Sequence, residues 1–131
     1  MRGSFLCVLA LAMSFALTTC VPCDCLEATL IGGVEGTSIK ITFESPLFAK
    51  DKFTVTWVQQ GGGVRVLHGT YENDGDKTIR FDVDGATDFL SVKSGQVNGL
   101  TCDKERGQFT ISTPTAGGPP LELKFQCTKK K

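Results

Sequence analysis

The chain has 131 residues, which is enough for one domain of ordinary size but not for two. Its 14 basic and 14 acidic side chains give a formal net charge of zero. This balance argues against nucleic-acid binding, which needs an excess of Lys and Arg on one face. Apolar residues make up 40% of the chain and charged residues 21%, so the composition is not that of a disordered chain.

Residues 1–20 are predicted to be a secretory signal peptide. Arg2 precedes an apolar run from Phe5 to Leu17, and small or polar residues follow as far as Cys20. These are the three parts of such a signal, and the run is shorter than the roughly 20 residues that a membrane span needs. Two alternatives stay open, a buried N-terminal helix and a lipoprotein signal with a lipid on Cys20. We expect a secreted protein without a membrane span, whose single domain covers residues 21–131.

Four cysteines remain if the signal is cleaved after Cys20; they are Cys23, Cys25, Cys102 and Cys127. A bond between the first two would close a very small strained ring, because one residue separates them. Each is therefore expected to pair with one of the last two, and both such pairings stay open. Disulfides of this kind are typical of small secreted domains, and the C-x-C spacing is not that of a zinc finger.

Alternation of apolar and polar residues predicts about nine strands, because a period of two with β-branched and aromatic residues is typical of half-buried strands. Trp57 is expected in the core, on the same strand face as Phe53 and Val55. In chain order the predicted strands are Leu26–Ile31, Thr37–Glu44, Lys52–Gln59, Val64–Tyr71, Thr78–Asp84, Phe89–Lys93, Val97–Cys102, Gln108–Thr113 and Leu121–Cys127.

Turn-forming residues separate these strands, among them the glycines at 61–63, Asp84-Gly85 and the proline-rich loop Pro114–Pro120. We therefore expect an all-β fold, a small antiparallel β-sandwich held by disulfides, with a closed small β-barrel as the alternative. The size and the single tryptophan are similar to those of immunoglobulin-like domains. Phe43 stands in the strand where a variable domain of that family carries a cysteine.

The acidic stretch 72–88 holds three aspartates around a glycine turn, Asp82, Asp84 and Asp88. Calcium binds six to eight oxygens in loops of this composition, but Arg80 stands where such a loop has its first ligand. We expect a hairpin with outward-facing aspartates and no metal. His68, the single histidine, has no predicted partner for acid–base chemistry.

We expect neither enzymatic activity nor a cofactor, because one histidine and four paired cysteines provide no nucleophile and base. The expected function is recognition of an extracellular protein or other macromolecule through loops. Leu47 and Phe48 are candidate contacts, because apolar residues in a loop need a reason. Gly61, Gly62 and Gly63 form a second candidate loop.

Two alternative functions stay open. The abundance of phenylalanine suggests a carrier of a small apolar ligand bound between the sheets. The start of the mature chain, Cys23-Asp24-Cys25, resembles that of metalloproteinase inhibitors, which implies an inhibitor of an extracellular enzyme.

Overall fold

The computed structural model describes residues 21–33, 36–46, 48–75, 77–85 and 88–131, so the predicted signal peptide at 1–20 lies outside it. All nine predicted strands are present, and the sixth of them is divided into two short strands. The elements are η1 (Pro22–Asp24), β1 (Cys25–Leu30), β2 (Ser38–Glu44), β3 (Lys52–Val58), β4 (Val64–Asp74), β5 (Thr78–Val83), β6 (Asp88–Phe89), β7 (Val92–Lys93), β8 (Val97–Asp103), β9 (Gln108–Thr113) and β10 (Leu121–Lys130).

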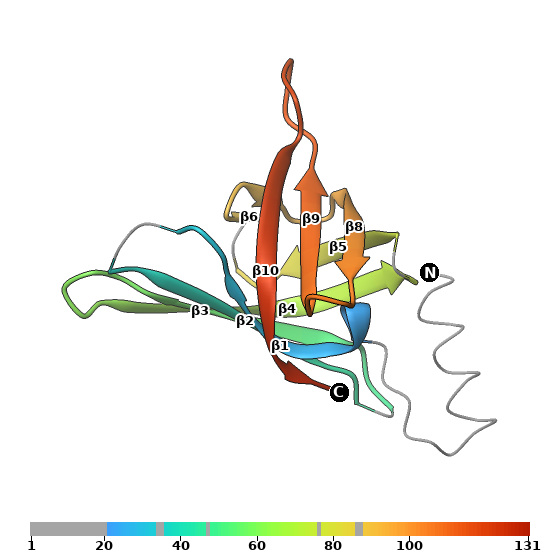
Figure 1. The fold of residues 1–131 in the computed structure, drawn as a ribbon, viewed down its shortest axis with the longest axis horizontal. Helices are drawn as coiled ribbons and strands as arrows, with labels where there is room; N and C mark the ends of the chain where they lie inside the picture. The colour runs from blue at the N-terminus through green and yellow to red at the C-terminus, as the bar shows by residue number, and fades with distance from the viewer. Residues whose placement is uncertain (1–20, 34–35, 47, 76, 86–87) are drawn as a thin grey trace.

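Eight of the strands close into a single antiparallel barrel, in the order β1-β10-β9-β8-β5-β4-β3-β2 (Figure 1). Strands β6 and β7 form a separate two-stranded hairpin between β5 and β8. The all-β, antiparallel prediction is confirmed, and the barrel that was its alternative replaces the two-sheet sandwich. The pairing of β1 with β10 is the reason, because it joins the first strand to the last and leaves one closed sheet. The comparison with immunoglobulin-like domains, which have two sheets, therefore does not describe this architecture.

Aromatic side chains fill much of the barrel interior. The ring of Phe43 lies 5.1 Å from that of Tyr71, between centroids, and the ring of Phe53 lies 4.8 Å from that of Phe81. Phe109 and Phe125 stack at 5.1 Å, and all six side chains are buried. An eight-stranded barrel has an interior about wide enough for its own side chains, and these rings supply them.

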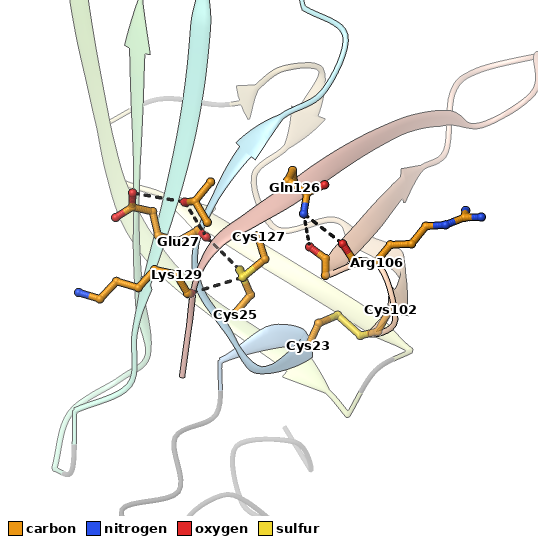
Figure 2. Close-up of a disulfide and its surroundings, with 10 residues drawn as sticks. Cys23, Cys25, Glu27, Cys102, Arg106, Gln126, Cys127 and Lys129 are labelled. Carbon is orange, nitrogen blue, oxygen red and sulfur yellow. Dashed lines mark hydrogen bonds between the residues drawn. A yellow bond between two sulfur atoms is a disulfide. The ribbon is translucent and has the colours of Figure 1, made fainter.

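Two disulfides hold one end of the barrel, which we call the disulfide end (Figure 2). Cys23 is bonded to Cys102, and Cys25 to Cys127, which is one of the two pairings that the spacing left open. Val21 and Cys25 are buried, so the N-terminal turn packs against the core. The bridges therefore tie the start of the described chain to β8 and to β10.

Hydrogen bonds add to these ties at the disulfide end. The backbone N–H of Cys127 donates to the carbonyl oxygen of Gly107 at 2.7 Å. The side-chain amide of Gln126 donates to the carbonyl oxygens of Arg106, at 3.1 Å, and of Gly107, at 3.2 Å (Figure 2).

In the part of the chain that the structure describes, no helix has the length and apolar character to cross a membrane.

Candidate binding surface

The residues predicted to form a binding surface lie at opposite ends of the barrel. Phe48, whose side chain is 98% exposed, is in the β2–β3 connection, and the turn at Gly61–Gly63 joins β3 to β4. Leu47 lies outside the described residues. Strand β3 has seven residues, so at about 3.3 Å per residue the two loops are roughly 20 Å apart. A small contact therefore cannot include both loops.

The proline-rich loop Pro114–Pro120, which was predicted as a connection, joins β9 to β10 and is exposed throughout. Figure 1 shows it projecting at the top of the view, while the β3–β4 hairpin projects at the left. The three loops thus point in three directions. They do not form one binding surface.

The β3–β4 hairpin extends beyond the end of β5, while β2 stays paired with β3 as far as Ser38 opposite Val58. The hairpin itself stays paired as far as Val58 opposite Val64, whereas β5 pairs with β4 only as far as Val83 opposite Gly69. A Cβ atom on Gly69 would collide with the carbonyl oxygen of Asp82 on β5. The backbones of β4 and β5 therefore approach there more closely than any residue with a side chain allows, and β5 then ends.

One edge of β4, over Val64–Leu67, has no neighbouring strand among the described residues. We call this segment the free edge. The last bond between β4 and the chain leaving β5 is from the N–H of Asp84 to the carbonyl oxygen of His68, at 2.8 Å. Backbone groups alternate in direction along an antiparallel strand. The N–H and C=O groups of Val64 and Val66 therefore point out of the free edge.

Three exposed valines cover the outer surface of the same hairpin; we call them the valine face. Val58 is 39%, Val64 58% and Val66 48% exposed. Val58 lies opposite Val64, and Val66 lies opposite Thr56. The next outward pair along the hairpin is Thr54 and His68. Contiguous apolar surface of this kind marks interaction sites more often than isolated exposed residues do.

The opposite face of the hairpin carries a tryptophan and an arginine. Trp57 shares a face with Val55 but is only partly buried, so the prediction that it is buried in the core is wrong in degree. The physical reason is its place one residue before the end of β3, where the barrel ends. The guanidinium of Arg65 lies 5.7 Å from the centre of the Trp57 ring. This contact holds the arginine on the inner face, away from the valines.

The three aspartates considered as calcium ligands come from different elements. Asp82 is on β5 and its carboxylate lies 3.5 Å from the guanidinium of Arg80; Asp84 is in the turn after β5, and Asp88 begins β6. Arg80 also contacts Glu72 at 3.4 Å. Within the described residues, no three His, Cys, Asp or Glu side chains are grouped so that they could hold a metal ion. What the structure shows here is an ion-pair cluster on the surface of β4 and β5.

His68 is exposed on the outer surface of β4. Its ring Nδ1 lies 3.4 Å from the hydroxyl of Thr54, its neighbour on β3. A general base needs a positioned substrate or nucleophile within hydrogen-bond reach. The contact with Thr54 is a cross-strand contact on a sheet surface.

A buried carboxylate anchors the β2–β3 connection. The hydroxyl of Ser45 donates to Asp51 at 2.7 Å, and Asp51 is 9% exposed. Burial raises the pKa of Asp51; the hydrogen bond from Ser45 opposes this, and the charge of Glu72 adds to it. Burial also raises the pKa of Tyr71, whose backbone N–H donates to the carbonyl oxygen of Asp51 at 3.0 Å. The connection is therefore fixed to the barrel next to the aromatic interior.

A cavity of about 120 Å³ lies beside the two disulfides (Figure 2). Phe109 contributes to its lining, together with Asp24, Lys104 and Lys130. Asp24 and Lys104 contact each other at 3.4 Å. Pockets for drug-sized ligands are larger, about 300–1,000 Å³. This cavity is therefore too small for such a ligand.

Val64 and Val66 were not among the predicted binding residues, although the sequence contains a sign of their exposure. The segment Val64–Tyr71 has apolar residues on both faces at its start, with Leu67 inward and the two valines outward. A half-buried strand has one polar face, so this departure marks exposed apolar surface.

Comparison of the chain with known proteins finds no matching family model, no matching curated protein and no matching solved structure.

Proposed function

We propose that this protein is an extracellular binding module that recognises another protein through the valine face of its β3–β4 hairpin. The observation that carries the proposal is the contiguity of Val58, Val64 and Val66, each more than a third exposed on a projecting hairpin. A partner with an apolar patch of matching size would remove this surface from water. The stabilisation would be about 25 cal/mol for each Å² of apolar surface buried.

An extracellular location is supported by two features of the chain. The two disulfides are of the kind that persists in oxidising compartments. Residues 1–20 have the sequence pattern of a secretory signal. A protein partner fits better than a nucleic acid, because the valine face is uncharged and the chain has no net positive charge.

A triple substitution of threonine for Val58, Val64 and Val66 tests the proposal. Threonine has nearly the same shape and strand propensity, so the hairpin should keep its structure. Burying three hydroxyls without partners costs about 1 kcal/mol each, so affinity should fall roughly 100-fold. The secreted protein is fixed to a biosensor surface and exposed to extracellular proteins of its source. The measurement compares how strongly the triple variant and the wild type bind the proteins that the wild type retains.

The matched control for this test is Val97→Thr. Val97 is 58% exposed on β8, opposite Arg80, and lies outside the hairpin. The Val97→Thr variant should bind the partner with an affinity within about twofold of that of wild type. Equal binding by the triple variant, or an equal loss in the control, would show that the valine face is not the recognition surface.

One observation favours a second candidate, a carrier of a small apolar ligand. Besides cysteines, six partly buried apolar side chains of the described residues lie at the margin of the core: Leu26, Leu30, Trp57, Leu67, Leu90 and Leu123. The indole N–H of Trp57 is buried and has no hydrogen-bond partner among the described residues. A fatty acid or sterol that remained bound in native mass spectrometry after addition to delipidated protein would favour this function over protein recognition.

The inhibitor alternative has less support. It would use the stapled N-terminal turn as the contact, but Val21 and Pro22 are buried against the core. The exposed apolar surface lies at the β3–β4 hairpin instead.

A further inference from the structure

Among the described residues, the free edge of β4 lacks the devices that normally protect a sheet edge. Such edges usually carry lysine or proline, a bulge, or a covering element. Residues Val64–Leu67 read Val-Arg-Val-Leu. The one charge among them, Arg65, lies against Trp57 on the neighbouring strand. The edge is therefore open to another strand.

Hydrogen bonds of the hairpin define the groups that this edge offers. At the tip, the N–H of Gln59 donates to the carbonyl oxygen of Gly63 at 2.7 Å. The backbone N–H and C=O groups of odd-numbered residues on β4 therefore point toward β3. The even-numbered Val64 and Val66 face the opposite way. Each copy of the chain thus presents two N–H and two C=O groups at the free edge.

We propose that the free edge pairs antiparallel with the free edge of a second copy, about a two-fold axis that passes through Arg65. In this register Val64 of each copy lies opposite Val66 of the other. Four N–H···O=C bonds then form and use all the groups that the two edges offer. A register shifted by one step in one direction would instead need His68, whose carbonyl oxygen already accepts from Asp84. A shift in the other direction would need Gly62, whose N–H already donates to Gln59.

Three features make a second copy the occupant that fits. A strand that pairs antiparallel with itself is self-complementary, as a two-fold interface requires. The outer surface of the dimer carries two mainly apolar rows of side chains that cross the four paired strands. Each row consists of Val58 and Val64 of one copy, followed by Val66 and Thr56 of the second copy. The net charge of the full chain is zero and changes only by the charge of Arg2 if residues 1–20 are removed, so two copies repel each other little at long range.

The two arginines on the axis are the one unfavourable element. Arg65 lies on the inner face and opposite Trp57 of its own chain. The ring draws each guanidinium toward β3 and so away from the axis. The paired edge is also short, so we expect a weak dimer whose population rises with protein concentration.

Dimer formation uses the backbone edge of β4, whereas the partner binding proposed above uses the outward valine side chains. Either can therefore fail without the other. Threonine at Val58, Val64 and Val66 keeps every edge N–H, so that variant should lose partner binding and still form dimers.

A cysteine scan tests the pairing and its register. Residues directly opposite in a non-hydrogen-bonded pair have Cα atoms about 4.5 Å apart, within the range of a disulfide. Arg65→Cys should therefore give a disulfide-linked dimer in a glutathione redox buffer, visible on a non-reducing gel. All described cysteines are already paired, so the new thiol is the free one among them.

The controls in this scan are Val66→Cys and Val97→Cys, which should stay largely monomeric. A linked dimer from Val66→Cys in place of Arg65→Cys would overturn the proposed register. A failure of both edge variants to link would overturn the edge pairing itself.

Sedimentation of the secreted protein over a range of concentrations provides a second, independent test. Val66→Pro removes an N–H that points out of the free edge and takes no part in the bonds between β3 and β4. It should weaken the dimer at least tenfold, while Val66→Thr should stay within about threefold of wild type. Unchanged dimerisation of a folded Val66→Pro variant would refute the proposal, and if this variant does not fold, the cysteine scan decides.

Discussion

Replacing Phe43 with alanine should lower the free energy of unfolding by about 3–5 kcal/mol, as large-to-small substitutions of buried aromatic residues do. Phe43 is 1% exposed, and its ring contacts Tyr71 at 5.1 Å and Phe109 at 6.1 Å. It therefore joins β2 to β4 on one side and to β9 on the other. Removing the ring would leave a cavity that the closed sheet cannot fill by collapsing.

Phe48→Ala is the matched control, because it removes the same side chain from a position that is 98% exposed. It should change stability by no more than about 0.5 kcal/mol. The measurement is denaturant unfolding of the disulfide-bonded protein under non-reducing conditions, followed by near-ultraviolet circular dichroism. Similar effects of the two variants would mean that Phe43 is not a central core residue.

Removing the bond between Cys25 and Cys127 should cost about 2–5 kcal/mol. The double variant with alanine at both positions avoids leaving a free thiol. The sequence separation of the bridge is 102, so it restricts nearly all of residues 21–131 before they fold. Cys25 is also 1% exposed and belongs to the core, so the variant loses packing as well as the cross-link.

The companion double variant at Cys23 and Cys102 separates these two effects. Its sequence separation is 79, so chain entropy predicts a cost within about 0.3 kcal/mol of that for the longer bridge. Cys23 is only partly buried. Thermal unfolding should therefore show the larger loss for Cys25 and Cys127, and a larger loss for Cys23 and Cys102 would contradict the burial argument.

The positions of the strands could be read from the sequence because side-chain alternation is a local property. Gln108–Thr113 has the predicted limits, and Leu121–Cys127 is extended by three residues at its end. Closure of the sheet could not be read in the same way. It depends on the pairing of β1 with β10, which are nearly a full chain length apart, and alternation is the same in a sandwich and in a barrel.

The binding surface was harder to predict than the fold. Phe48 and the glycines at 61–63 lie at the two ends of one strand, β3, so they cannot share a small contact. The predicted strand Lys52–Gln59 already implied this separation. The exposure of Val64 and Val66 depends on where β5 leaves β4. The last pair is Val83 opposite Gly69, where a Cβ atom would collide with the backbone of Asp82. A glycine within a strand is a local sign of such a close approach, but it does not indicate where the neighbouring strand ends.

Amide hydrogen exchange measured by NMR in dilute protein tests most directly whether the hairpin ends in a free, solvent-exposed edge. The N–H groups of Arg65 and Leu67 point toward β3 and should be protected, whereas those of Val64 and Val66 should exchange at least tenfold faster. Raising the protein concentration should then slow exchange at the two valines. Equal protection of all four amides in dilute solution would contradict the account, because it would mean that β4 already has a partner on both sides.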